Sequence, residues 1–230
     1  MKTFILPILA FFFLSTTTFS QTTPIRSDFQ IWNDTSITIP LKKSTDGNGK
    51  AFDRLTFSVN GTLRFGRDAS RPVDERISVS FNYRLNKYVS LSPETLYRGY
   101  QPFKGSKSFE SQLRFSVILN KNWKRFSLND RNQIEYRLRN SAKNSFRYKN
   151  RLRLNVPINR NGKEIFTPFV SDEPYYDFQA KTWTRNELFA GFGKKFNKSF
   201  SADFFYLFVK DKGFPKTVNG IGVSFKFRID

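Results

Sequence analysis

From about residue 53 onward, apolar and polar residues alternate along most of the chain. Between Arg54 and Phe65 the odd positions are apolar except for one glycine, and the even positions are polar. The same alternation returns over residues 76–85 and 221–229. A period of two residues belongs to a β-strand, because its successive side chains point to opposite faces. Each segment therefore predicts a strand with one apolar and one polar face.

The full chain contains eleven such segments, most of them about 11 to 14 residues long, which suits a membrane strand that needs roughly 9 to 11 residues. Bacterial single-chain membrane barrels usually have an even number of strands. We therefore predict twelve strands, with a further one near residues 22–33, and keep ten as the alternative. The eleven segments cover residues 28–41, 53–66, 74–85, 88–100, 108–119, 126–139, 145–156, 164–177, 183–195, 199–210 and 218–229.

The N-terminus has the pattern of a secretory signal peptide. Lys2 precedes an apolar run over residues 4–14, and small residues follow it. This run is too short to span a bilayer, for which a helix needs about 20 apolar residues. We predict a signal peptide over residues 1–20 and one outer-membrane β-barrel domain over residues 21–230. The protein would be exported to the outer membrane of a Gram-negative bacterium.

Composition favours a membrane barrel over a soluble protein. The chain contains 28 phenylalanines and 17% aromatic residues, yet its mean hydropathy is −0.52. In a transmembrane barrel the apolar and aromatic side chains face lipid while the other half of each strand stays polar, which reconciles the two values. We expect an all-β fold, a single antiparallel up-and-down transmembrane barrel in contact with outer-membrane lipid.

The net charge of +20 would ordinarily suggest a nucleic acid or an acidic surface as partner. The arginines, however, stand singly at alternate strand positions rather than in one run or on one helix face. In a barrel those positions face the lumen. We therefore expect no nucleic-acid partner, and small anionic solutes become the candidate ligands.

The chain contains neither histidine nor cysteine. A serine–histidine or aspartate–histidine general base, a cysteine nucleophile and a zinc site built from these ligands are therefore excluded. We expect no enzyme activity, no metal and no cofactor. An enzyme that works with carboxylates alone is the third alternative.

Seven charged residues are predicted to face the lumen: Arg137, Arg139, Arg151, Arg153, Glu173, Arg185 and Glu187. Such residues could fill a narrow lumen as ion pairs that satisfy one another. Alternatively, an excess of arginine could draw anions through a pore or hold an anionic group. Glu173 is expected to face inward as a counter-ion of the arginines around it, with Asp172 facing outward.

The order of several motifs along the chain resembles one protein family. These motifs are Trp32, Tyr136-Arg137-Leu138-Arg139, Asn150-Arg151-Leu152-Arg153, Thr167-Pro168-Phe169-Val170-Ser171-Asp172-Glu173, Arg185-Asn186-Glu187-Leu188-Phe189-Ala190-Gly191-Phe192 and Phe205-Tyr206-Leu207. They resemble the domain-of-unknown-function 2490 family (DUF2490), secreted proteins common in Bacteroidetes and regarded as outer-membrane barrels. The resemblance implies a location and an architecture, but no activity or ligand.

The leading hypothesis is a small outer-membrane barrel, either structural or a porin-like narrow pore with an arginine-rich, anion-preferring lumen. The alternative is a soluble periplasmic β-barrel that binds a lipid or another apolar ligand, with its apolar positions facing a cavity and its arginines outside. The shortest connections, near Asn86 and Asn197, are expected on the periplasmic side. The sequence leaves open the oligomeric state and whether the lumen is plugged.

Overall fold

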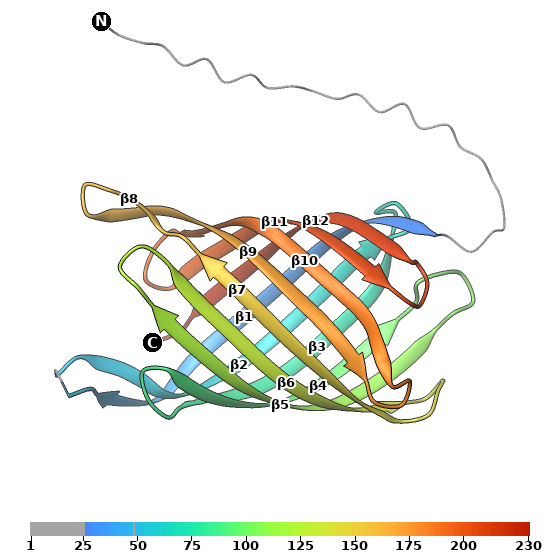
Figure 1. Cartoon of the computed structure of the whole chain (residues 1–230), viewed down its shortest axis with the longest axis horizontal. Helices are drawn as coiled ribbons and strands as arrows, with labels where there is room; N and C mark the ends of the chain where they lie inside the picture. The colour runs from blue at the N-terminus through green and yellow to red at the C-terminus, as the bar shows by residue number, and fades with distance from the viewer. Residues whose placement is uncertain (1–25, 48) are drawn as a thin grey trace, which may run out of the picture.

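The computed structural model describes residues 26–47 and 49–230, which form an all-β barrel (Figure 1). The predicted signal peptide lies outside the described residues. Within them the strands are β1 (Ser27–Thr45), β2 (Ala51–Gly66), β3 (Arg71–Arg84), β4 (Val89–Tyr100), β5 (Ser108–Asn122), β6 (Ser127–Arg139), β7 (Ser145–Asn155), β8 (Ile158–Arg160), β9 (Lys163–Asp177), β10 (Thr182–Lys195), β11 (Phe200–Asp211) and β12 (Thr217–Arg228). The described part of the chain has no helix with the length and apolar character that crossing a membrane requires.

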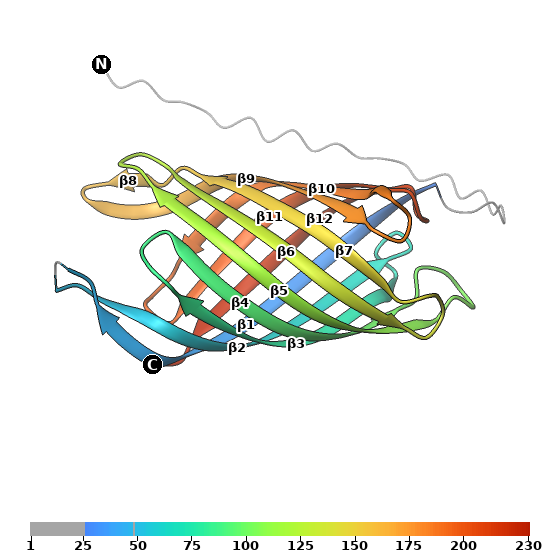
Figure 2. The same cartoon turned by 60° about the horizontal axis from the view of Figure 1, so that its bottom comes forward.

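In the described part of the chain, eleven strands form a closed wall, and β8 lies outside it. β8 pairs only with β9, as a short hairpin that extends from one end of the barrel. Neighbouring wall strands are antiparallel and follow chain order, with β9 next to β7. The barrel closes where β1 and β12 pair in parallel, from Ser27 opposite Thr217 to Thr38 opposite Arg228. Figure 2 shows the steep tilt of the strands around the barrel.

The predicted all-β barrel is confirmed, but its wall differs from the expected one. Over residues 26–47 and 49–230 the structure has twelve strands, of which only eleven belong to the wall, and each of these matches one segment read from the sequence. The described part of the expected additional strand near residues 22–33 belongs to β1, which begins at Ser27, and residues 22–25 lie outside the described residues. The even-number rule assumes antiparallel closure, whereas here a parallel pair satisfies the two edge strands.

The odd number of wall strands places the start of β1 and the end of β12 at opposite ends of the barrel (Figure 1). The short connections 85–88 and 196–199 lie at the end where β12 finishes, which we name the turn end. The longer connections 101–107 and 212–216 lie at the other end, which we name the loop end.

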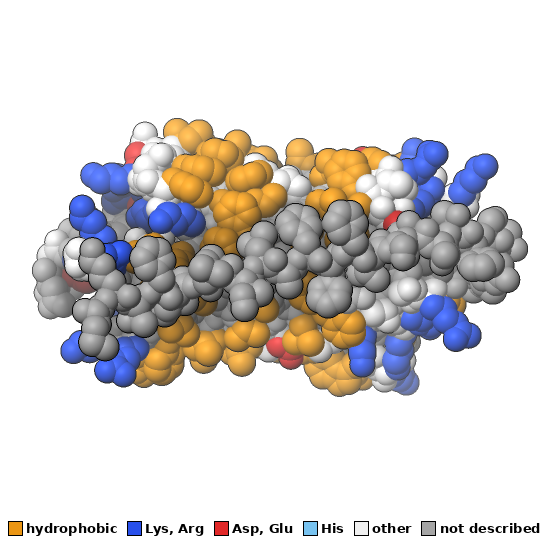
Figure 3. All heavy atoms as spheres, turned by 90° about the horizontal axis from the view of Figure 1, so that it is seen from above, with side chains coloured by type: hydrophobic (Ala, Val, Ile, Leu, Met, Phe, Trp, Pro, Cys, Tyr) orange, Lys and Arg blue, Asp and Glu red, His pale blue; other side chains and the backbone are white. Residues whose placement is uncertain are grey.

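Side chains face the two sides of the wall in the alternation that the sequence shows. Ile77 and Leu113 are more than half exposed on the outside, whereas Gln112 and Glu135 are almost fully buried inside. Figure 3 shows the result on one face of the barrel, an apolar belt with lysines and arginines at both ends. This orientation contradicts the soluble alternative, which required apolar residues around a cavity and arginines on the outside.

An apolar cluster fills part of the barrel interior. Trp32, Leu207, Val209 and Val218 are buried, and Phe189 and Phe205 pack against them. Glycines on β12 leave the space for this cluster. A Cβ atom on Gly222 would lie 2.5 Å from the Phe205 ring and 3.0 Å from the backbone oxygen of Trp32. Glycine at this position therefore lets two large aromatic side chains lie on the inner face.

Candidate functional site

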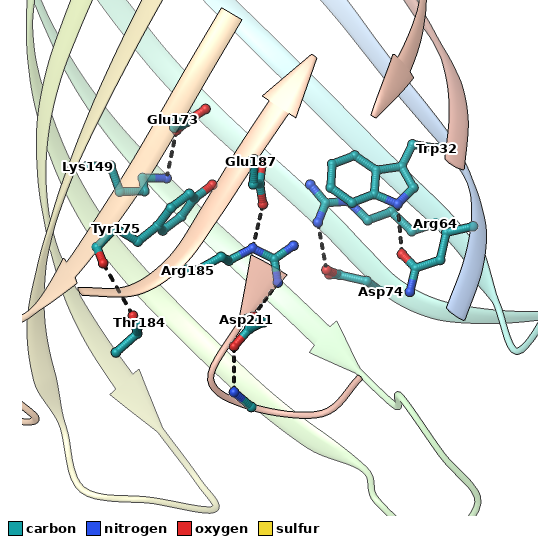
Figure 4. A network of polar contacts seen from close by, with 12 residues as sticks. Trp32, Arg64, Asp74, Lys149, Glu173, Tyr175, Thr184, Arg185, Glu187 and Asp211 are labelled. Carbon is teal, nitrogen blue, oxygen red and sulfur yellow. Dashed lines mark hydrogen bonds and ion pairs between the residues drawn. The ribbon is translucent and has the colours of Figure 1, made fainter. Parts of the chain in front are cut away.

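A layer of packed side chains lies in the lumen, in the half of the barrel nearer the loop end (Figure 4). Trp32 is 1% exposed, and its indole Nε1 donates a hydrogen bond of 2.8 Å to Oε1 of Gln30. The guanidinium of Arg64 lies 3.4 Å from the centre of the indole ring. Stacked planar groups of this size leave little space between opposite walls.

Asp74 is the acidic centre of this layer. Its side chain is 2% exposed and accepts hydrogen bonds of 2.9 Å from Nε of both Arg76 and Arg98. Nη1 of Arg64 lies 3.4 Å from the same carboxylate. Three guanidinium groups from three neighbouring strands thus share one buried carboxylate, which balances only part of their charge.

A second set of ion pairs surrounds Glu135, which is completely buried. Its carboxylate pairs with Arg147, lies 3.1 Å from Nζ of Lys149 and lies 3.4 Å from Nε of Arg114. These contacts join β5, β6 and β7 on the inner face. This part of the lumen is filled by mutually satisfied charges, as the first sequence interpretation requires.

On β9 and β10, two acidic residues lie side by side in the ladder. Glu173 pairs in register with Glu187, and both face inward. Arg185 bonds to Glu187 and to Asp211, each at 2.6 Å (Figure 4). Glu173 instead accepts a hydrogen bond of 2.7 Å from Arg131. Each carboxylate therefore has its own arginine, which reduces the repulsion between them.

Next to this layer the lumen contains a cavity of about 360 Å³. Its lining includes Ser224 and Lys226, in the half of β12 nearer the turn end, together with Trp32 and Phe189 of the packed layer. Small polar residues such as Ser36 and Asn60 line it as well. Small side chains on several strands leave this part of the lumen open. Nearer the loop end, the larger side chains of the packed layer fill the lumen.

Cations outnumber carboxylates around the cavity. Eight basic residues line it: Arg64, Arg76, Arg114, Arg131, Lys149, Arg151, Arg153 and Lys226. Four acidic residues line it: Asp34, Glu173, Glu187 and Asp203. A wall with such an excess of positive charge attracts anions and repels cations.

Arg151 is the one basic residue of this described lining that pairs with no carboxylate. Its Nε atom is buried and has no hydrogen-bond partner among the described residues. Arg151 lies in register with Arg131 on β6, and Arg131 forms the ion pair with the nearby Glu173. On the same strand Arg153 bonds to Asp203 at 2.8 Å and lies over the Phe169 ring.

The β7–β9 ladder is interrupted beside Arg151. Pairing runs through Lys149 opposite Tyr175 and resumes at Leu152 opposite Asp172, with no pairs between them. Pro174 lies in this gap and has no N–H to donate. The interruption at Pro174 therefore lies beside the unpaired arginine.

The structure does not gather the seven predicted residues into one cluster. Arg151, Arg153, Glu173 and Glu187 line the cavity, whereas Arg185 belongs to the packed layer. Arg137 lies outside the cavity lining and bonds to Glu110 at 2.6 Å. Arg139 bonds to the backbone carbonyl of Lys143 at the loop end.

The expected surroundings of Glu173 were wrong in part. Arg151 is a neighbour without an ion pair, and the ion-pair partners of Glu173 are Arg131 at 2.7 Å and Lys149 at 4.0 Å. Sequence reasoning missed these two basic residues, although both stand at inward positions of segments assigned as strands. Alternation alone would have included them.

The cavity offers charge and hydrogen-bond donors. The described residues contain no group of three or more acidic, histidine or cysteine side chains suited to a metal ion. The unpaired guanidinium of Arg151, which lines the cavity, can donate to the oxygens of an anion.

Comparisons with known proteins identify a family and one similar structure. The structure titled "LpxR from Salmonella typhimurium" matches with 9% sequence identity and a TM-score of 0.48, covering 82% of this chain and 86% of that chain. A comparison with curated proteins finds no match. The family model described as "Protein of unknown function (DUF2490)" matches residues 29–217, and the chain therefore belongs to this family.

Proposed function

We propose that this protein is an outer-membrane β-barrel that binds small anions in its lumen and does not act as an open pore. The exposed apolar belt and the long tilted strands support the location. The observation that carries the function is Arg151, a cavity-lining guanidinium without a counter-ion.

An anion in this cavity would supply the negative charge that Arg151 lacks. A buried charge without a partner is unfavourable, so a ligand that supplies negative charge beside Arg151 gains free energy from the pairing. Guanidinium groups bind phosphate, sulfate and carboxylate through paired N–H donors. A volume of about 360 Å³ lies within the size range of small-ligand sites.

Titration calorimetry with inorganic pyrophosphate tests the proposal on the full mature chain refolded in detergent. We expect Arg151→Gln to weaken binding by about tenfold or more, since one charge-assisted hydrogen bond contributes roughly 1.5 to 3 kcal/mol. Arg139→Gln is the matched control, because Arg139 lies at the loop end and not in the cavity lining. Equal binding by both variants, or no binding by the wild type, would refute the anion site.

Planar-bilayer recording separates binding from conduction. Because packed side chains cross the lumen, we expect no sustained conductance in potassium chloride. Steady chloride-selective steps would instead support the narrow pore. Heat-modifiable gel migration and retention in the outer-membrane fraction after a high-salt wash test the location, and release into the soluble periplasm would refute it.

A further inference from the structure

A polar patch interrupts the apolar outer surface of β6, β7 and β9. Asp130, Asn132, Asn150 and Asp172 face outward there, and we name these four residues the polar island. Leu128, Leu154 and Val170 flank the island toward the turn end, and Ile134, Tyr148 and Tyr176 flank it toward the loop end. The island therefore lies within the belt rather than at its edge.

Three members of the island bond to one another. Nδ2 of Asn150 donates to Oδ1 of Asp130 at 2.5 Å, and Nδ2 of Asn132 donates to Oδ2 of Asp130 at 3.2 Å. The hydroxyl of Tyr148 donates to Oδ1 of Asn132 at 2.5 Å. These bonds give Asp130 two donors but no positive charge.

Asp172 lies apart from these bonds. Its side chain is exposed, and among the described residues that side chain makes no hydrogen bond or ion pair. Leu152 separates the two carboxylates, because it pairs with Asp130 on one side and with Asp172 on the other. The island thus presents one carboxylate on each side of the Leu152 side chain, which is 45% exposed.

Acyl chains cannot satisfy these groups. In the hydrocarbon region of a membrane, ionisable side chains are unfavourable unless they face protein, a water-filled cavity or an opposite charge. Lipid headgroups lie beyond the apolar residues that flank the island on both sides. The surface of another membrane protein can place polar side chains against the island within the hydrocarbon region.

A second copy of this chain does not provide the missing charge. The outward positions of β6, β7 and β9 are even-numbered, and they include no lysine or arginine. Two copies packed through this face would place four carboxylates together without a cation, in a medium where like charges repel strongly. Charge complementarity therefore selects a basic partner.

We propose that the polar island is an interface for a membrane-spanning protein that presents a lysine or arginine over Leu152, between Asp130 and Asp172. The basic side chain would pair with both carboxylates and replace the lipid that otherwise contacts them. This interface rests on the proposed membrane location, but it lies on the outer surface and does not depend on anion binding in the lumen.

The test uses a synthetic partner and a fluorescence label. Because the chain contains no cysteine, Leu152→Cys provides a single site for a donor dye in the full mature chain, refolded into phosphatidylcholine vesicles. The probe is a leucine-rich membrane-spanning peptide with one central lysine and an acceptor dye. Matched peptides carry leucine or glutamate instead. Ile37→Cys on β1 labels a distant face of the wall as the control.

We expect energy transfer at the Leu152→Cys site to show at least about fivefold tighter association of the lysine peptide than of the leucine peptide, since a polar contact of about 1 kcal/mol within a membrane corresponds to this ratio. Asp172→Asn should remove most of this preference. Asp172→Asn leaves the backbone pairing unchanged and removes no side-chain hydrogen bond or ion pair of the described residues, so we expect this variant to fold as the wild type does.

Three results would overturn the proposal. The lysine and leucine peptides could associate equally, or the preference could survive both Asp172→Asn and Asp130→Asn. Efficient disulfide dimers of the Leu152→Cys variant without peptide would show that a second copy covers the island instead. Heat-modifiable migration of every variant confirms that the compared barrels are folded.

Discussion

The parallel closing pair makes Gly220 a residue at which one added methyl group should be damaging. Gly220 pairs with Gln30 across the β1–β12 boundary. A Cβ atom at this position would lie 2.2 Å from the backbone oxygen of Gln30 and 3.4 Å from Cγ of Leu207. The closest neighbour is backbone, which cannot rotate away as a side chain can. Gly220→Ala therefore has to push the two strands apart.

The expected loss of stability in Gly220→Ala follows from the distance between the added Cβ and the backbone oxygen of Gln30. Ordinary contacts between a carbon and a carbonyl oxygen are about 3.3 Å or longer, so the strands must separate by roughly 1 Å. Such a shift breaks the ladder hydrogen bonds on either side of the site. Two bonds at about 1 to 3 kcal/mol each predict a loss of roughly 2 to 6 kcal/mol in the free energy of unfolding, because lipid offers no replacement partners.

Urea unfolding in lipid vesicles, followed by tryptophan fluorescence, measures this loss. Gly61→Ala is the matched control, since Gly61 lies within β2 and a Cβ there meets no atom within 4 Å. We expect the control to be neutral or to stabilise the barrel by about 0.5 to 1 kcal/mol. If both variants unfold alike, β1 and β12 do not form the closing pair, and the eleven-strand wall is wrong.

Three further predictions concern the wall and the lumen. Asp74→Asn should lower the free energy of unfolding by about 3 to 5 kcal/mol, measured by the same urea assay, because it leaves three arginines without the negative charge that they share. Trp32→Ala removes the largest side chain of the packed layer, and bilayer recording should then show brief ion-conducting steps that the wild type lacks. Ile77→Arg should impair folding into vesicles by about 2 to 4 kcal/mol. Leu152→Arg should cost at least about 1 kcal/mol less, because two carboxylates flank it. Equal costs would argue against the acidic surroundings of Leu152.

Alternation in the sequence was sufficient to locate every wall strand, because each strand buries one face and exposes the other. It could not reveal how the wall closes. The residues of β1 and β12 read alike whether the two strands pair in parallel or antiparallel, since both arrangements satisfy the same backbone groups. The short β8 falls between the segments 145–156 and 164–177 and was not predicted, because three residues after Pro157 are too few to establish a period.

The inward direction of the candidate site residues was also predictable, but their partners were not. Arg153 bonds to Asp203, which lies 50 positions away on β11. Such a pair depends on which strands face each other across the lumen and on their relative shift along the barrel axis. Alternation predicts whether a residue faces the lumen or the outside, but it predicts neither which strands face each other nor their relative shift. The absence of a partner for Arg151 is a property of the closed barrel for the same reason.

The register of the closing pair connects the barrel wall with the proposed anion site. Trp32 lies opposite Gly222 across the β1–β12 boundary, and the missing side chain there leaves room for the aromatic packing that crosses the lumen. Two and four residues further along β12, Ser224 and Lys226 line the cavity. A shift of this pair by two residues would place Ser224 opposite Trp32, where its side chain would compete with the packed layer. Closure of the wall and the shape of the cavity are therefore determined together, and a change at Gly220 that disturbs the boundary should weaken pyrophosphate binding as well as stability.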